Sequence, residues 1–170
     1  GMDIRTAPYE YNGQTYHIQI VRVQPSTFDI ALQYDQEGRT IGEWKKNVNG
    51  VVFNSGFFKE GNEPVGLLYI DGRRIDDHRI RPAGTGLLTI QDGEVDISNL
   101  STSEISSANQ LQNALQAFPM LISKGKVVAD SSLIKEDRRT AIGIDAQKNI
   151  YILTAEYSHL GLYKLATELQ

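Results

Sequence analysis

The sequence contains no cysteine, only one tryptophan and only three histidines among its 170 residues. The lack of cysteine excludes disulfides, thiolate metal sites and cysteine nucleophiles. The histidines, His17, His78 and His159, are scattered and do not have the spacing of zinc ligands. Dinucleotide fingerprints and phosphate-cradling glycine loops are also missing from the sequence. We therefore expect neither a metal nor a cofactor.

Long apolar runs and a surplus of basic residues are missing as well. No stretch approaches the roughly 20 apolar residues of a membrane span, and the segment after Met2 lacks the apolar region of a signal peptide. These absences predict no membrane association, and a cytoplasmic location in the chain as given. The net charge of −4 argues against a nucleic-acid partner, because general phosphate-backbone binders carry a basic patch.

What the sequence does contain is mostly strand-like patterning. Apolar residues that alternate with polar ones are typical of half-buried strands, and they recur at Tyr16, Ile18 and Ile20, and at Phe28, Ile30 and Leu32. Residues 51–53 read as a short buried strand and residues 41–46 as one or two helical turns. The later strands are expected at residues 65–70, 87–90, 94–97, 120–122, 127–128, 140–144 and 150–153, with turns at 71–72, 92–93, 124–125 and 145–149.

Two helices are expected in addition. Ser101 and Glu104 have capping-box spacing, and Ile105, Ala108, Leu111 and Leu115 would share one helix face until Pro119 ends the helix. A second helix is expected from the spacing of Leu162, Leu165, Ala166 and Leu169. The prediction is an α+β fold of one domain over residues 1–170, with a mixed, mostly antiparallel sheet, one long central helix and a C-terminal helix. Residues 1–15 would form an edge or loosely ordered segment.

The segment Asn54-Ser55-Gly56-Phe57-Phe58 is the first candidate for chemistry. An asparagine at a strand end can donate and accept hydrogen bonds at once, as sugar hydroxyls require. Phe57 and Phe58 could pack on the face of a sugar ring. The alternative is a structural turn with both phenylalanines in the core.

The segment Asp137-Arg138-Arg139-Thr140 is the second candidate. An arginine before a strand can clamp a phosphate or carboxylate with its planar guanidinium, although a solvated charged loop is the alternative. Glycoside hydrolysis usually needs two carboxyl groups, and Asp137 and Glu60 are the candidates for a general acid. The mixed charges of residues 73–81 favour a solvated loop.

Several segments together resemble the phosphodiester glycosidase family in order and spacing. The family has a strand that ends in Asn-Gly-Gly-Phe-Phe, a Pro-x-Gly-Leu segment, an Ala-Leu-Gln-x-Gly-Pro-x-Leu stretch and an Arg-Thr-Ala-Ile-Gly strand. The matching segments begin at Asn54, Pro64, Ala114 and Arg139. Ser55 and Phe118 replace family glycines. In the family, a segment Asn-Leu-Asp-Gly-Gly follows the last helix, and no match to it occurs in this sequence up to Gln170.

The resemblance implies a hydrolase that cleaves a sugar phosphodiester or a related glycosidic bond, with a carbohydrate ligand. Arg139 would hold the phosphate, and Asn54 a sugar hydroxyl or a developing oxyanion. Asp137 would complete the catalytic group, and the substrate-binding residues would be Phe57, Phe58, Thr140 and Glu60. One alternative is a non-catalytic relic that binds glycans or serves a structural role. Another is a domain whose site a partner chain completes, for example in a homodimer through an exposed sheet edge.

Overall fold

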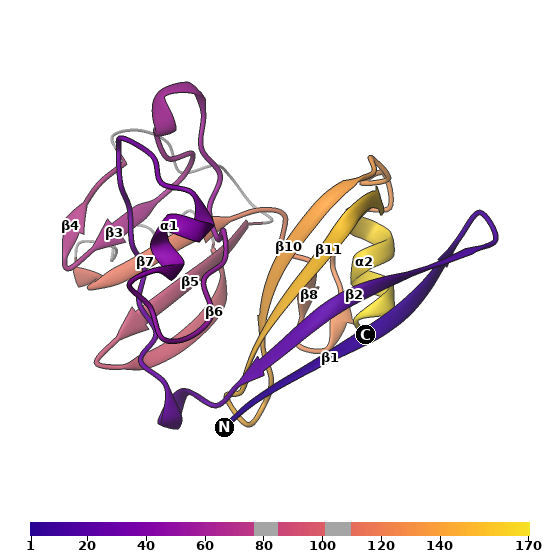
Figure 1. Ribbon diagram of the computed structural model, residues 1–170, viewed down its shortest axis with the longest axis horizontal. Helices are drawn as coiled ribbons and strands as arrows, with labels where there is room; N and C mark the ends of the chain where they lie inside the picture. The colour runs from indigo at the N-terminus through magenta and orange to yellow at the C-terminus, as the bar shows by residue number, and fades with distance from the viewer. Residues whose placement is uncertain (77–84, 101–109) are drawn as a thin grey trace.

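The computed structural model describes residues 1–76, 85–100 and 110–170, and of residues 156–159 only the backbone. Figure 1 shows two sheets side by side, with the C-terminal helix on the far side of one of them. The first sheet has the strand order β1-β2-β11-β10 and the second the order β4-β3-β7-β5-β6. A small hairpin, β8-β9, accompanies them.

The bounds of the elements follow from the backbone hydrogen bonds. The first sheet consists of β1 (Met2–Tyr11), β2 (Gln14–Val23), β10 (Asp137–Ile144) and β11 (Ile150–Leu160). The second sheet consists of β3 (Leu68–Ile70), β4 (Arg73–Arg74), β5 (Thr85–Gln91), β6 (Glu94–Leu100) and β7 (Asn113–Ala117). The remaining elements are β8 (Ile122–Ser123), β9 (Lys126–Val127), α1 (Ile41–Lys45), α2 (Leu162–Glu168) and the 3-10 turns Pro25–Thr27 and Glu60–Asn62.

The antiparallel β character expected from the alternating pattern is confirmed, since all the described strand pairs are antiparallel. The helical turns at residues 41–46 and the C-terminal helix are confirmed as α1 and α2. The hairpin turns also form where expected, and Asp71 and Asp92 adopt positive φ angles of 50° and 52° there. Residues 1–15 contain β1, an edge strand of the first sheet.

The long central helix is wrong. Residues 113–117, which it was expected to contain, form β7 between β3 and β5. Its neighbouring strands satisfy the hydrogen bonds of its backbone on both sides, and Ala114 and Gln116 are both 0% exposed there. The capping box and the apolar residues Ile105 and Ala108 lie outside the described residues.

Three further expectations need correction. Residues 28–32 and 51–53 form no strand in the described structure, although Phe28, Ile30 and Phe53 pack against the core as partly buried side chains. Of the charged residues 73–81, residues 77–81 lie outside the described part of the chain, and the described part is not a simple solvated loop, since it contains β4. Asp76 is only 6% exposed, accepts a hydrogen bond from the Leu68 amide at 3.1 Å and pairs with Arg74 at 3.2 Å.

The main core lies between the two sheets. Val23, Ile150 and Ile152 of the first sheet pack in one cluster with Leu88 and Leu115 of the second. A second cluster lies beneath α2 and includes Ile18, Leu153, Ala155 and Leu165. The first sheet therefore buries one part of its inner face, toward the second sheet, and covers its outer face with α2.

The β10–β11 turn fixes the register of these strands. The Asp145 carboxylate accepts hydrogen bonds from the Asn149 backbone and side chain, both at 2.8 Å, and from the Tyr151 hydroxyl at 3.1 Å. Bonding to the Asn149 side chain is the main cause that lowers the pKa of this carboxyl below its ordinary value. The charged form of Asp145 is thus the one that stabilises the turn.

Candidate functional site

The inner face of the first sheet changes from apolar to polar along its strands. At one end, the cross-strand neighbours Ile142, Ile152 and Val21 pack in the core between the sheets. Two residues further along each strand, a row of polar side chains crosses all four strands. We call this the polar row, and its members are Thr140, Thr154, Gln19 and Thr6.

The polar row is accessible to a ligand. Thr140, Gln19 and Thr6 are exposed, and Thr154 is half-buried. Successive residues of a strand point to opposite faces, so these side chains lie on the same face as the buried isoleucines and next to the second sheet. Hydroxyl and amide groups both donate and accept hydrogen bonds, and the row is therefore suited to a polyhydroxylated ligand.

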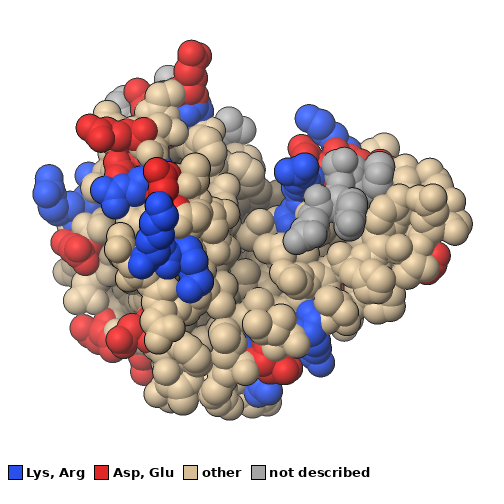
Figure 2. Space-filling model, in the orientation of Figure 1, with Lys and Arg blue, Asp and Glu red and all other residues tan. Residues whose placement is uncertain are grey.

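A hollow separates the two halves of the molecule above the core. Figure 2 shows the surface notched between them, with Lys or Arg and Asp or Glu side chains together on the rim that belongs to the half containing the first sheet.

Arg139 lies on the other face of the first sheet from Thr140. Its cross-strand neighbour is Ala155, which packs beneath α2. The guanidinium donates from Nε to the Leu160 carbonyl at 3.1 Å and from Nη2 to the Lys135 carbonyl. The structure therefore uses Arg139 to join the segment before β10 to the end of β11, and its phosphate-binding role stays a prediction.

The segment from Asn54 to Phe58 has no regular secondary structure and leads into a loop closed by main-chain hydrogen bonds. Val65 donates to the Phe57 carbonyl at 2.8 Å, and Lys59 donates to Glu63 at 3.0 Å. Asn54 is exposed, and its amide has no hydrogen bond with the described residues, so it is free to meet a ligand. A Cβ at Gly56 would lie 3.1 Å from the Leu115 side chain, which favours a glycine two residues after the asparagine.

The two phenylalanines differ in their surroundings. Phe57 stacks on Phe118, with ring centroids 4.6 Å apart and an interplanar angle of 24°. Both Phe57 and Phe58 remain largely exposed, at 47% and 61%. The alternative in which both phenylalanines lie in the core is wrong, whereas their role on a sugar ring stays a prediction.

The two candidate carboxylic acids are also exposed. Asp137 begins β10, and its carboxylate accepts a hydrogen bond from the next backbone amide, of Arg138, at 2.9 Å. Glu60 begins a 3-10 turn in the loop that follows Phe58. No measured contact joins the two side chains, and the general-acid role of either stays a prediction.

Sequence reasoning missed Thr154 and Gln19. Gln19 lies within the alternating segment predicted as a strand, and Thr154 directly follows the strand predicted at residues 150–153, but the sequence does not reveal that β2 and β11 pair. Gln116 was also missed as a buried residue: its Oε1 accepts from the Leu67 amide at 3.0 Å and its Nε2 donates to Thr85 at 3.2 Å. The Ala-Leu-Gln sequence was a usable signal, because a glutamine inside an apolar strand needs such partners.

The described residues form neither a metal-binding cluster nor a membrane-spanning helix. They contain no group of three or more His, Cys, Asp or Glu side chains placed to hold a metal ion. Over the same residues, none of the helices has the length and apolar character needed to cross a bilayer.

Comparison with known proteins decides the family. The family model described as phosphodiester glycosidase matches residues 46–169, which include the segments at Asn54 and Arg139. The chain belongs to the phosphodiester glycosidase family. No curated protein sequence matches the chain.

Solved structures share the fold of this phosphodiester glycosidase family member. One is the zebrafish N-acetylglucosamine-1-phosphodiester alpha-N-acetylglucosaminidase catalytic domain auto-inhibited by its pro-peptide, with a TM-score of 0.61 and 13% identity over 99% of this chain and 66% of that chain. Another is a hypothetical protein from Synechocystis, with a TM-score of 0.61 and 13% identity over 100% of this chain and 54% of that chain. The chain thus spans 66% and 54% of the lengths of these two structures, and the likeness shows the fold alone.

Proposed function

We propose that this chain is a carbohydrate-active hydrolase domain that cleaves a sugar phosphodiester or a related glycosidic bond. The observation that carries the proposal is the family match over residues 46–169. It covers both segments that chemistry would require, the exposed amide at Asn54 and the strand that carries Thr140.

In this proposal the polar row binds the sugar. The hydroxyls of Thr140 and Thr154 and the amide of Gln19 lie at neighbouring register positions, so one ring with several hydroxyls can meet more than one of them. Asn54 would bind a further hydroxyl or a developing oxyanion. Phe57 and Phe58 would border the site with their exposed rings.

Arg139 would act on the polar row mainly through the backbone, because its guanidinium lies on the other face of the first sheet. Two of its five N–H donors are used by the Leu160 and Lys135 carbonyls. These bonds hold the start of β10, and with it Thr140, in place. Its remaining N–H groups lie on the other face of the sheet from the polar row, so the proposed phosphate-binding role of Arg139 requires a ligand that extends past the start of β10. Asp137 or Glu60 is proposed for proton transfer.

A second candidate function is binding of a glycan without hydrolysis. It is favoured by the commitment of the Arg139 guanidinium to two backbone carbonyls and by the Phe118 ring stacked on Phe57. A related proposal is that a partner chain completes the site. The strand that carries Thr140, β10, is an edge strand of the first sheet, and unpaired edges can accept a further strand.

The test is hydrolysis of a phosphodiester that joins N-acetylglucosamine to a simple alcohol. We expect the purified chain to release the free sugar, measured by chromatography. Thr140→Val and Asn54→Ala should each lower kcat/KM by roughly tenfold, because each removes a hydrogen bond worth about 1.4 kcal/mol in the transition state.

Two matched variants serve as controls. Thr167→Val changes an exposed threonine of α2, and Asn47→Ala an exposed asparagine after α1, and both should retain the activity. Binding of the phosphodiester without any release of sugar would replace hydrolysis by the second candidate function. Release that neither Thr140→Val nor Asn54→Ala affects would show that the polar row is not the site.

A further inference from the structure

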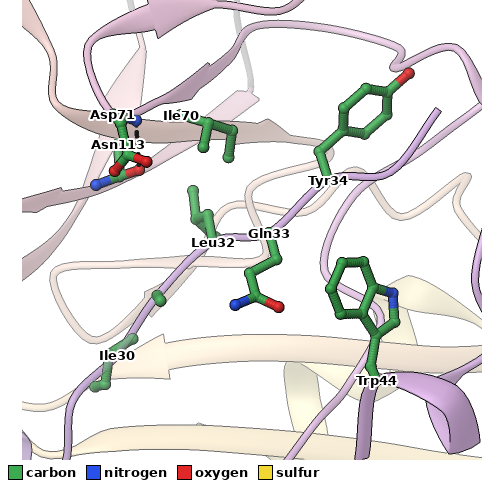
Figure 3. Close-up of a pocket in the computed structure, with 9 residues that line it drawn as sticks. Ile30, Leu32, Gln33, Tyr34, Trp44, Ile70, Asp71 and Asn113 are labelled. Atoms are coloured by element: carbon green, nitrogen blue, oxygen red, sulfur yellow. Dashed lines mark hydrogen bonds between the residues drawn. The ribbon is translucent and has the colours of Figure 1, made fainter. Parts of the chain in front are cut away.

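A hollow of about 360 Å³ lies in the other half of the molecule, between α1, the 30–34 segment and the ends of β3 and β7. Figure 3 shows the aliphatic side chains of Leu32 and Ile70 on one side of it and the indole of Trp44 on another. None of the residues of the polar row lines this hollow. The volume is in the range of small-ligand sites, which combine apolar walls with a few polar groups.

Several polar groups of the hollow have no hydrogen bond with the residues that the structure describes. The Gln33 amide and the Trp44 indole N–H have no hydrogen bond with the residues that the structure describes, and the Gln33 side chain is exposed. Asn113 accepts a hydrogen bond from the Asp71 backbone amide at 3.0 Å through its Oδ1, and no measured bond involves its Nδ2 hydrogens. The hollow therefore presents amide and indole donors, an amide acceptor and the Asp71 carboxylate.

The tryptophan is held firmly in place. Thr40 and Glu43 form a capping box at the start of α1, with the Thr40 amide donating to Glu43 Oε2 at 2.7 Å. The Arg39 guanidinium lies 4.9 Å from the Trp44 ring centroid and pairs with Asp35 at 2.5 Å. A ring fixed by its neighbours loses little conformational entropy when a ligand packs on it.

Tyr34 contributes its ring and not its hydroxyl. The hydroxyl donates to the Asn62 carbonyl at 3.1 Å, and burial, with the nearby Glu63 and Asp35 carboxylates, raises the pKa of the phenol. Two aromatic rings and three aliphatic side chains, those of Ile30, Leu32 and Ile70, thus surround the free amides.

The charge of the hollow argues for a neutral ligand. No lysine or arginine is among the described residues that line it, whereas the Asp71 carboxylate is. An anion such as a phosphate would meet a like charge there. A neutral sugar presents C–H groups to aromatic and aliphatic surfaces and hydroxyls to amides and carboxylates.

We propose that this hollow, with Trp44, Gln33 and Asn113 at its centre, is a second carbohydrate-binding site that takes a neutral saccharide. It does not depend on the proposed function, because none of its groups belongs to the polar row. In a hydrolase, such a site would hold a neutral part of the glycan that is cleaved, or another branch of that glycan.

The test uses Trp44 as its own reporter, since it is the single tryptophan of the chain. We expect N-acetylglucosamine and mannose to change the fluorescence of the purified chain saturably, in the millimolar range. N-acetylglucosamine 1-phosphate should bind more weakly than the uncharged sugar. Gln33→Ala should weaken binding about fivefold to tenfold, the loss of one hydrogen bond of about 1 to 1.4 kcal/mol.

The controls separate this site from the polar row. Gln36→Ala changes an exposed glutamine outside the hollow, and Thr140→Val changes the polar row, so both should leave the fluorescence titration unchanged. The absence of any saturable change, or an equal affinity in Gln33→Ala, would overturn the proposal. Loss of the signal in Thr140→Val alone, or tighter binding of the 1-phosphate, would also overturn it.

Discussion

The side chain of Gln116 shows how one residue joins three strands. It is 0% exposed in β7, it accepts from the Leu67 amide beside β3, and it donates to Thr85 of β5. Gly66, at a φ of 104°, leaves room for it, because a Cβ there would lie 3.0 Å from Gln116 Oε1. A buried amide with partners on both sides is stabilising only while all its bonds are made.

Replacing this glutamine by leucine should therefore cost stability. In Gln116→Leu the buried Leu67 amide loses its acceptor, and we expect the free energy of unfolding to fall by about 1 to 3 kcal/mol. Urea denaturation followed by circular dichroism measures it. Gln36→Leu, at an exposed position, is the control and should have no such effect. An unchanged midpoint for Gln116→Leu would contradict this account of the amide.

At the scale of residues, the sequence predicts whether a side chain is exposed better than it predicts which face of a sheet the side chain points to. Asn54 was predicted to follow a strand and to offer its amide to a ligand, and the structure leaves it exposed although residues 51–53 form no strand. Adjacent Arg139 and Thr140 were predicted for one site, but they point to opposite faces of the first sheet. A shift in register between Asp137 and Arg139 is set by pairing with β11, which the local sequence does not reveal.

The element that departs most from prediction is β7. Leu111 and Leu115 are spaced as on one helix face, but a short apolar run is equally compatible with a buried central strand. Pairing on both sides, with β3 and β5, decided between the two. Elements at the surface were easier to predict, because the capping box at Thr40 and the apolar spacing at Leu162 act locally.

The C-terminal helix is anchored by a close backbone approach. Gly161 precedes α2, and the Tyr163 amide donates to the Leu133 carbonyl at 3.1 Å. A Cβ at Gly161 would lie 2.9 Å from the Ile134 carbonyl oxygen and 3.1 Å from its Cα. These are backbone atoms, which cannot move aside as the end of a flexible side chain can.

We expect Gly161→Ala to destabilise the protein by about 1 to 3 kcal/mol, the usual cost of overpacking. The effect is steric, since Gly161 has an ordinary φ of −72°. Gly143→Ala is the matched control, because a Cβ there meets nothing within 4 Å. Thermal unfolding of the two variants should therefore differ clearly, and equal midpoints would contradict the proposed anchoring of α2.

At the scale of the whole molecule, the cluster between the sheets makes one cooperative unit. Ile150 is 2% exposed in β11 and shares this cluster with Leu88 and Leu115 of the second sheet. Neither sheet can bury these side chains alone. The two halves seen in Figure 1 should accordingly unfold together.

Ile150→Ala tests this cooperativity from one half to the other. We expect a loss of about 2 to 5 kcal/mol that shifts the Trp44 fluorescence transition and the far-UV circular dichroism transition equally. Ile134→Ala, at a position that is 73% exposed, should have little effect on either. Transitions at two different urea concentrations would show that the halves unfold independently.

The pairing of β2 with β11 has a consequence for how the protein can fold during its synthesis. During synthesis β2 emerges early with only β1 beside it, and its partner β11 appears near the C-terminal end of the chain. Until β11 is made, one edge of β2 has no partner strand, although the second sheet that packs on Val23 has already emerged. We therefore expect this unpaired edge to be the part of the nascent chain most prone to wrong pairing and aggregation.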